Sequence, residues 1–278
     1  MATKKTQIIT LVCNKGGVGR STTAINIAWS LANKRCNVLV CDLDAQANTS
    51  SSLAKNYQED VIEDGRHVTN LLKSYGDSAT DYLVDTSNPN IKLLASTLML
   101  DNTEGEIKSQ LDFNVFRLFD HFFNRKLKSE FDFIIIDTPP QKSSILTLNA
   151  LLTSDWYWYV LSAEDQWSLD ARIVSDKIMQ DVRKLNSKIR PLPVLMTKFV
   201  NGSSQSIEMK NIAASEFKAG VFKTTIGYSS VVSKSHSNRK SIREFSSGHR
   251  IAKNYDSCLL YTSPSPRDRT RSRMPSSA

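Results

Sequence analysis

Three glycines lie within four positions of the segment Lys15–Thr22 (KGGVGRST), although the whole chain has only ten. The apolar run Gln7–Cys13 precedes this segment, and a helical pattern over Ser21–Asn33 follows it. Glycines between a strand and a helix let backbone N–H groups converge on phosphate oxygens, and the helix N-terminus adds partial positive charge. A serine or threonine in the first helical turn can supply its hydroxyl to Mg²⁺. The segment therefore predicts a phosphate-binding loop.

Two common glycine-rich patterns do not describe this loop. Thr22 stands where the dinucleotide fingerprint GxGxxG needs its third glycine. The ordinary phosphate loop, GxxxxGK[ST], fails twice, because Asn14 replaces the first glycine and Arg20 replaces the lysine.

The loop resembles instead the deviant phosphate loop, KGGxGK[ST], of the ParA/MinD superfamily. Two further segments agree with that family in order along the chain. Val38–Asn48 (VLVCDLDAQAN) is similar to its second motif, DxDPQGN, and Phe131–Pro140 (FDFIIIDTPP) is similar to its Walker B strand and the switch that follows. The resemblance spans about residues 7–243.

The resemblance implies that ATP and Mg²⁺ bind at this loop. Ser21 would bind Mg²⁺ directly, and Asp137 would hold it through water. The phosphates would be held by seven consecutive residues of the loop and the first helical turn, Gly16, Gly17, Val18, Gly19, Arg20, Ser21 and Thr22.

The resemblance also implies catalytic roles. Lys15 is similar to the family's signature lysine, which reaches the partner's phosphates across a nucleotide-sandwich dimer and offsets transition-state charge. Asp44 resembles the carboxylate that orients the attacking water, with Asp42 in support. The plainer interpretation of Asp42, Asp44 and Asp137 is that each carboxylate caps the end of a strand, but their grouping beside the loop favours the functional one.

Three positions depart from the family pattern. Arg20 keeps the positive charge of the usual lysine, but its planar guanidinium is larger than a compact ammonium. We hypothesise that nucleotide still binds and that hydrolysis is slowed. Ala45 and Ala47 replace the usual proline and glycine of the second motif, which leaves the conformation of that switch open.

The formal net charge of +8 is unevenly distributed. Residues 1–219 have 25 basic and 25 acidic side chains, whereas residues 220–257 have seven basic and two acidic ones, a net of +5. Such a segment is either a solvated face or a surface for phosphate backbones, and the neutrality of the rest favours DNA. The DNA-binding candidates are Lys234, Arg239, Lys240, Arg243, Arg250 and Lys253.

The last 21 residues have a different character. Residues 258–268 (CLLYTSPSPRD) resemble the translation of a sequencing-library adapter, and residues 272–278 (SRMPSSA) continue it after a three-codon gap. We therefore expect residues 258–278 to be a non-native, disordered tail, and the natural chain to be truncated at about residue 257.

Short apolar runs alternate with helical patterns along the chain, as in a parallel sheet covered by helices on both faces. With the resemblance, this predicts an α/β fold, a single-domain P-loop NTPase over residues 1–257 with a mainly parallel sheet flanked by helices. The predicted strands are Gln7–Cys13, Asn37–Cys41, Ile91–Ala95, Phe131–Ile136, Trp156–Leu161 and Val194–Met196, and the predicted helices are Ser21–Asn33 and about 67–75, 106–128, 143–153, 166–187 and 206–218.

The function that the resemblance implies is that of a ParA-type ATPase for plasmid or chromosome partitioning. Its ATP-bound homodimer would bind DNA without sequence preference, and a ParB-like centromere-binding partner would stimulate hydrolysis. The resemblance implies a cytoplasmic, nucleoid-associated protein, and no apolar stretch is long enough to span a membrane. Two alternatives are a MinD-like or flagellar-type positioning ATPase, whose C-terminal amphipathic membrane helix would have been lost, and a nucleotide-binding scaffold with little catalysis.

An iron–sulfur carrier of the same superfamily is disfavoured, because the four cysteines form no CxxC pair. A tyrosine autokinase is also disfavoured, because Tyr261 belongs to the expected tail.

Overall fold

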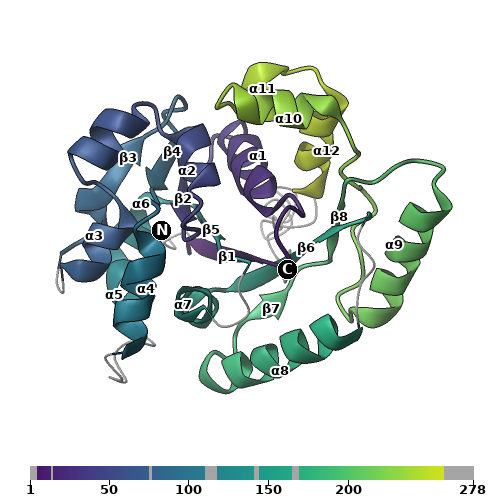
Figure 1. Ribbon diagram of the computed structural model, residues 1–278, viewed down its shortest axis with the longest axis horizontal. Helices are drawn as coiled ribbons and strands as arrows, with labels where there is room; N and C mark the ends of the chain where they lie inside the picture. Colours follow the sequence, from purple (N-terminus) through teal and green to yellow (C-terminus); the bar gives the residue numbers. More distant parts are fainter. Residues whose placement is uncertain are drawn as a thin grey trace, which may run out of the picture.

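In the computed structural model, an eight-stranded sheet runs through the centre of the described residues, which are 5–13, 15–74, 77–109, 118–140, 144–164 and 169–259 (Figure 1). The strand order is β3-β4-β2-β5-β1-β6-β7. Strand β8 pairs with the second half of β6, whereas β7 pairs with its first residues. All pairings are parallel except that of β3 with β4. The strands are β1 (Gln7–Val12), β2 (Val38–Asp42), β3 (Leu83–Asp85), β4 (Ile91–Leu94), β5 (Phe133–Asp137), β6 (Trp156–Ser162), β7 (Arg190–Pro191) and β8 (Leu195–Thr197).

Helices cover both faces of this sheet (Figure 1). They are α1 (Arg20–Ala32), α2 (Asn48–Leu53), α3 (Val68–Lys73), α4 (Leu100–Ser109), α5 (Leu118–Phe122), α6 (Arg125–Glu130), α7 (Ile145–Thr153), α8 (Leu169–Leu185), α9 (Ser204–Glu216), α10 (Ser230–Ser237), α11 (Ile242–Phe245) and α12 (Arg250–Cys258). Two short segments of other helical types lie at Tyr57–Glu63 and Ala79–Tyr82.

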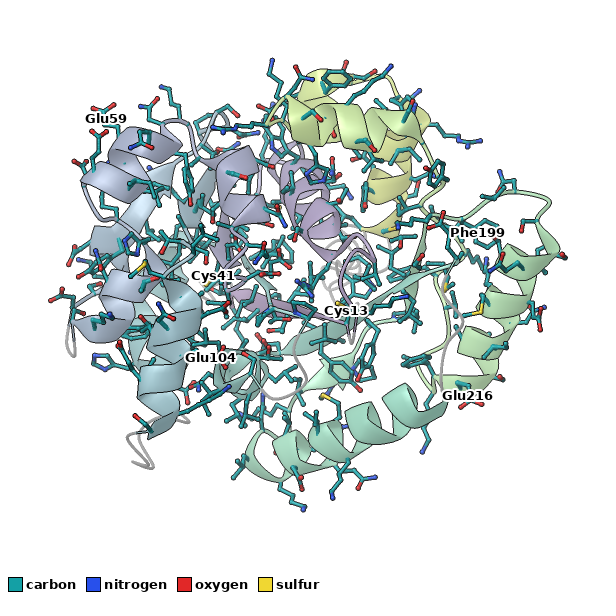
Figure 2. The ribbon with its side chains drawn as sticks, in the orientation of Figure 1. Cys13, Cys41, Glu59, Glu104, Phe199 and Glu216 are labelled. Carbon is teal, nitrogen blue, oxygen red and sulfur yellow. The ribbon has the colours of Figure 1, made fainter. Side chains whose placement is uncertain are left out.

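The central strands are buried on both faces, as their unbroken apolar runs predict. In β2, the side chains of Val38 and Val40 pack in the core that includes α1, while Leu39 and Cys41 pack in the core on the opposite face. Cys41, labelled in Figure 2, is fully buried. The predicted α/β fold with a mainly parallel sheet is confirmed.

Strand order also determines where a ligand can bind. The connection from β1 to β2 runs toward the β3 edge of the sheet, and the connection from β5 to β6 runs toward the β7 edge. In parallel sheets, the crevice at the carboxyl ends of the strands beside such a reversal is the usual ligand site. The glycine loop follows β1 and therefore lies at this crevice.

Some predicted elements differ from the structure. The single helix predicted over residues 106–128 is wrong, because α4 begins earlier, at Leu100, and the chain starts a new helix, α6, after Asn124. The Asn124 side chain accepts a hydrogen bond from Leu127 N and caps α6. Residues 110–117 and 260–278 lie outside the described residues. They include part of that predicted helix and most of the expected adapter-derived tail.

The start of that expected tail is part of the described fold. Cys258 is the last residue of α12, and Leu259 follows it as the residue that ends the helix. Both side chains are buried in the core that includes α1. The two residues therefore pack in the interior.

The sequence pattern predicts no helix beyond residue 218, yet residues 230–258 include α10, α11 and α12. These helices are short and polar, and side-chain caps begin each of them. Ser241 and Glu244 form a reciprocal capping box at α11, and His249 accepts from Ile251 N at α12. The buried side chains of Ile242 and Tyr255 attach the group to the core that includes α1.

Candidate functional site

The glycine loop turns sharply between β1 and α1. Gly17 and Gly19 have φ of 76° and 87°, in the left-handed region that glycine adopts without strain. Gly19 is the N-cap residue of α1 and has no side-chain cap, so the first N–H groups of the helix are available to an anion. The prediction of a strand, a glycine turn and a helix is confirmed here, while Asn14 lies outside the described residues.

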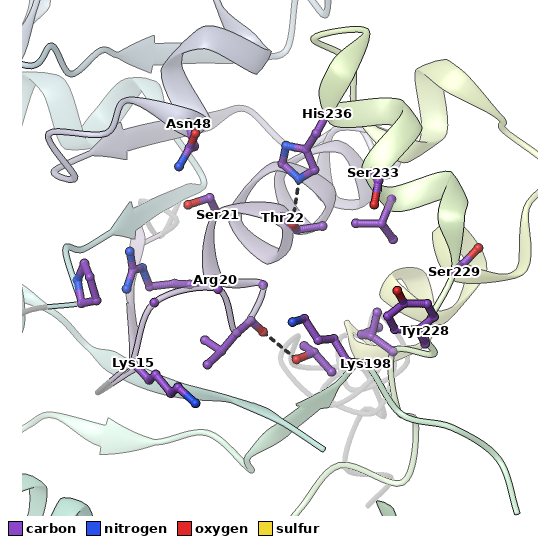
Figure 3. A pocket seen from close by; sticks show the side chains of 18 of the residues that line it. Lys15, Arg20, Ser21, Thr22, Asn48, Lys198, Tyr228, Ser229, Ser233 and His236 are labelled. Carbon is purple, nitrogen blue, oxygen red and sulfur yellow. Dashed lines mark hydrogen bonds between the residues drawn. The ribbon is translucent and has the colours of Figure 1, made fainter. Parts of the chain in front are cut away.

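A cavity of about 510 Å³ opens over the loop (Figure 3). One wall is formed by the loop and by Ser21 and Thr22 at the start of α1. Asp44 and Asn48, which follow β2, also line it. The cavity therefore joins the loop to the end of β2, as the motif order predicts.

The opposite wall of the cavity comes from segments to which the sequence motifs assign no nucleotide contact. These are Thr197 and Lys198 at the end of β8, residues 226–229, one side of α10, and Tyr255 of α12. The Thr197 hydroxyl donates to the carbonyl of Val18 at 2.6 Å and so fastens β8 to the loop. No spacing rule could have found these residues, because they lie 175 or more positions away along the chain and are brought in by the sheet order.

Asp42 and Asp137 lie side by side, because the parallel register of β2 and β5 pairs them directly. Both carboxylates are fully buried and hydrogen-bonded. Asp42 accepts from the backbone N–H and hydroxyl of Ser50 at 2.8 and 2.7 Å, and Asp137 accepts from the Thr49 hydroxyl at 2.7 Å. Neither lines the cavity within the described part of the chain.

Asp44 is the carboxylate of this group that lines the cavity. Its backbone N–H donates to Asp42 at 3.1 Å, and its own carboxylate accepts from Gln46 N at 3.0 Å. Asp42 therefore holds the backbone of the residue that faces the cavity. Asp42 thus both caps the end of β2 and supports Asp44, so both interpretations of this carboxylate apply.

Arg20 connects the carboxylates. Its guanidinium donates from Nε to Asp137 at 2.7 Å, from Nη2 to Asp44 at 2.7 Å and from Nη1 to the Cys13 sulfur at 2.8 Å. The Arg20 side chain is only 6% exposed. Figure 3 shows its guanidinium on the far side of the loop from Tyr228 and His236. The three side chains that bind the Arg20 guanidinium, those of Asp137, Asp44 and Cys13, thus lie at the carboxyl end of the sheet.

Burial governs the electrostatics of this cluster. It raises the pKa of Asp42 well above the ordinary aspartate value, and the negative charge of Asp137 raises it further. Burial also raises the pKa of Asp44, despite the opposing effects of Gln46 N–H and Arg20. For Arg20 burial acts to lower the pKa, but the charge of Asp137 and the other neighbours outweighs it. Arg20 therefore remains a cation held by carboxylates.

Cys13 takes part in the same cluster. It follows β1 directly below the start of α1 (Figure 2). Its thiol donates to the carbonyl of Lys15 at 3.0 Å, and burial raises its pKa. The sulfur is thus a neutral acceptor for Arg20.

The switch after β2 contains a left-handed residue that is not glycine. Ala47 has φ of 50° and ψ of 31°, and it is the residue before α2. This conformation costs an L-residue with a Cβ roughly 1–2 kcal/mol, whereas glycine adopts it freely. At Ala47 the switch therefore keeps the left-handed backbone conformation that suits the glycine of the DxDPQGN motif, although the residue is alanine.

The basic candidates occupy one group of helices beside α1. Lys234 lies on α10, Arg239 and Lys240 follow that helix, and Arg250 and Lys253 lie on α12; all five are exposed. Helices α11 and α12 both contact α1, and α10 contacts α11 (Figure 1). The structure thus brings these five side chains to the same part of the molecule.

Arg243 differs from the other five, because it is partly buried and forms an ion pair with Asp256. This ion pair joins α11 to α12. Arg243 therefore has a structural partner that the sequence did not indicate.

No helix within the described ranges is long and apolar enough to cross a membrane.

Comparisons with known proteins agree on one family. The family model described as AAA domain matches residues 6–190. The chromosome partitioning protein ParA of Myxococcus xanthus is 32% identical over 221 residues, which are 79% of this chain and 75% of the relative. The sporulation initiation inhibitor protein Soj of Bacillus subtilis is 27% identical over 249 residues, 85% of this chain and 90% of the relative.

Solved structures give the same result. A putative plasmid partition protein of Borrelia burgdorferi bound to AMPPNP is 26% identical, with a TM-score of 0.74 over 93% of this chain and 98% of the other. A cobyrinic acid a,c-diamide synthase of Mycobacterium smegmatis with bound ADP and magnesium is 22% identical, with a TM-score of 0.76 over 98% and 99%. This second likeness is one of fold alone.

Proposed function

The chain belongs to the family of ParA- and Soj-like partition ATPases, and on this premise we propose that it binds and hydrolyses ATP with Mg²⁺ and binds DNA as an ATP-bound dimer. The observation that carries the proposal is the cavity in which the glycine loop, Ser21 and Asp44 meet. A phosphate-binding turn, a hydroxyl suited to Mg²⁺ and a carboxylate able to orient water are the parts that phosphoryl transfer to water requires.

The residues of the cavity fit a nucleotide. Its volume of about 510 Å³ lies within the range of roughly 300–1,000 Å³ that is usual for such sites. A Cβ built on Gly16 or Gly17 would meet nothing within 4 Å, so the backbone of the loop is open to an approaching phosphate. We assign the phosphates to the N–H groups from Gly16 through Thr22, Val18 included.

The same residues suit Mg²⁺, which prefers oxygen ligands and keeps several waters. Among the described residues no group of three or more histidine, cysteine or acidic side chains is arranged to hold a metal ion. We propose that the ion rests on the Ser21 hydroxyl and on phosphate oxygens. Asp137 is buried behind the cavity wall and bonded to Arg20 and Thr49, so it would act on the ion through water. When bound, it would neutralise charge on the phosphates.

Asp44 would orient the attacking water, since it is the buried carboxylate that lines the cavity. Asp42 supports it by accepting the hydrogen bond from its backbone N–H. Lys15 is exposed at the edge of the cavity, where a partner's nucleotide could approach it. We propose that Lys15 contacts the phosphates of the second copy, as the family resemblance implies.

Arg20 would restrain hydrolysis. The usual lysine at this position is a compact ammonium that contacts the β- and γ-phosphates, whereas the guanidinium here is held by Asp137 and Asp44. ATP must compete with two carboxylates for this cation. The Arg20 contacts also engage Asp44, the residue that would orient water. We therefore propose slow turnover.

A second candidate function follows from the same contacts. If Arg20 never leaves the carboxylates, the protein is a nucleotide-binding scaffold with little catalysis. ATP analogue binding without measurable phosphate release, even in the presence of DNA, would favour this alternative.

DNA binding is proposed for the five exposed basic side chains beside α1. Side chains that neutralise phosphates without reading bases give binding that is independent of sequence and sensitive to salt. In this proposal the ATP-bound dimer resides on the nucleoid in the cytoplasm. A ParB-like centromere-binding partner stimulates hydrolysis and releases it.

Salt-dependent DNA binding tests this part of the function. Affinity for a duplex of arbitrary sequence is measured with an ATP analogue over a range of salt concentrations. Lys234→Glu with Lys240→Glu should weaken binding and reduce the slope of log affinity against log salt by about 1.8, at about 0.9 per lost phosphate contact. The control, Lys126→Glu with Lys188→Glu, reverses the same charge on exposed lysines of residues 1–219 and should keep the slope. Equal losses in both pairs, or no binding by the unmodified protein at low salt, would contradict the proposal.

A further inference from the structure

A hydrogen bond connects the phosphate loop to the C-terminal helices across 214 positions of sequence. The hydroxyl of Thr22, near the start of α1, lies 2.7 Å from Nε2 of His236 on α10 (Figure 3). Thr22 is 9% exposed, and both residues line the cavity. The bond therefore lies at the wall where the phosphates of a nucleotide would be.

The two neighbouring threonines of α1 use their hydroxyls differently. Thr23 donates to the carbonyl of Gly19 at 2.8 Å, which is the usual bond of a threonine to its own helix. The Thr22 hydroxyl instead bonds to the side chain of His236. The orientation of the Thr22 hydroxyl proton therefore depends on which atom of this pair is the donor.

A hydroxyl has one proton and two acceptor lone pairs. If Thr22 donates to His236, its proton points away from the cavity and a lone pair faces any anion there. If His236 donates from Nε2, the Thr22 oxygen accepts and its own proton is free to point at an anion. Only the second arrangement suits a phosphate.

The charge state of His236 is compatible with the second arrangement. Burial lowers the pKa of His236, so the imidazole is neutral near pH 7 and has one donor nitrogen and one acceptor nitrogen. A neutral imidazole with its proton on Nε2 can donate to Thr22. No change of protonation state is needed.

We propose that His236 is a positioning residue for the nucleotide, which donates from Nε2 to Thr22 and so directs the Thr22 hydroxyl proton at a phosphate oxygen. This inference rests on the proposed function, because it requires a nucleoside diphosphate or triphosphate in the cavity. It gives α10 a role in phosphate binding that the loop motif does not contain. By thermodynamic linkage, bound nucleotide stabilises the position of α10 to the same extent that α10 favours nucleotide.

Binding of ADP with Mg²⁺ to the full chain tests the proposal through a double-mutant cycle. His236→Leu should weaken ADP binding about threefold to tenfold, the effect of one neutral hydrogen bond. Thr22→Val, which keeps the shape but removes the hydroxyl, should weaken binding by a similar or greater factor. In the Thr22→Val background, His236→Leu should have almost no further effect.

Two further variants separate positioning from packing. His236→Gln retains an N–H donor at similar reach and should restore affinity to within about twofold. Ser237→Ala alters the exposed neighbour of His236 on the same helix and serves as the matched control. Independent, multiplying losses in the double mutant, or a glutamine variant as weak as the leucine variant, would overturn the proposal.

The unmodified protein supplies a test that does not depend on the folding of a variant. Nitrogen-15 spectra of the His236 ring in the presence of ADP should show the proton on Nε2 and a bare Nδ1. A proton on Nδ1 with a bare Nε2 would overturn the proposal. If the unmodified protein bound no ADP, the proposed function would fail as well, whereas the other adverse outcomes reject only the role of His236.

Discussion

Arg20→Lys should lower protein stability and raise ATP turnover, because the contacts of Arg20 that stabilise the fold are the ones that must break during hydrolysis. The guanidinium makes its contacts with Asp137, Asp44 and Cys13 from three separate nitrogens, at 2.7, 2.7 and 2.8 Å. A lysine has one terminal nitrogen and cannot reproduce that geometry. We expect the variant to be less stable and faster in ATP turnover.

The loss of stability can be estimated from these contacts. Hydrogen bonds to charged groups contribute about 1.5–3 kcal/mol each, and the ammonium keeps the charge and part of the bonding. The free energy of unfolding should therefore fall by about 2 kcal/mol, which lowers Tm by roughly 3–4 °C in a chain of this size. Arg20→Met removes the cation and leaves buried carboxylates unpaired, so its loss should reach about 3–5 kcal/mol.

Turnover should change in the other direction. A compact ammonium that is less firmly held by Asp137 and Asp44 can contact the phosphates, and Asp44 is freed to orient water. One such electrostatic contact in the transition state is worth a factor of about ten or more. Phosphate release is measured at saturating ATP and Mg²⁺, with and without DNA. Arg35→Lys, the same exchange at an exposed position just after α1, should change neither quantity.

Two results would refute this reasoning. Turnover that stays within about twofold while Tm falls would show that the Arg20 contacts do not restrain hydrolysis. An unchanged Tm would show that the buried contacts contribute no net stability, as some buried ion pairs do not.

Three further predictions concern the switch and the loop. Ala47→Gly should raise the free energy of unfolding by about 1 kcal/mol, because glycine relieves the left-handed strain; urea denaturation measures this, and a lower stability would argue against strain. The raised pKa of Asp44 means that its protonated form persists to higher pH, so kcat should fall on acidification at a higher pH than an ordinary aspartate would give. Lys15→Gln should leave ADP affinity nearly unchanged and lower ATP turnover by about tenfold or more, and calorimetry with phosphate release would show whether the two separate.

The central strands and α1 could be predicted because their sequence pattern follows from burial. In β5 the side chains of Ile134 and Ile135 face opposite cores, and both are buried, so no polar residue interrupts the run. The glycine loop could be located as well, because a left-handed turn before a helix favours glycine at positions such as Gly17 and Gly19.

The C-terminal helices could not be predicted in this way. The sequence of α10, SVVSKSHS, has few apolar residues and no helical stripe long enough to stand out. Its helix depends on the Ser229 cap and on tertiary packing, in which Val231 is buried. The part of the cavity wall that α10 forms was missed for the same reason.

The partners of Arg20 could not be predicted either. The motif places Arg20 at the phosphates, but the register of β2 and β5 brings Asp42 and Asp137 together at the end of the sheet, with Asp44 close by. Two of these buried carboxylates, Asp137 and Asp44, then hold the guanidinium, while Asp42 accepts from Asp44 N and from Ser50. A motif describes local spacing, whereas this arrangement arises from strand pairing across 95 positions of sequence.

The basic segment of residues 220–257 also forms part of the cavity wall. The excess of +5 lies in residues 220–257, and the same residues supply Tyr228, His236 and Tyr255 to the cavity wall. Lys234 is two residues from His236 on α10, so a shift of this helix moves a DNA-binding candidate and a phosphate-site residue together. Because linkage is reciprocal, DNA that favours one position of α10 must change nucleotide affinity by the factor with which nucleotide changes DNA affinity. Measuring ADP affinity with and without duplex DNA gives that factor, and the Thr22→Val variant should bring it closer to one.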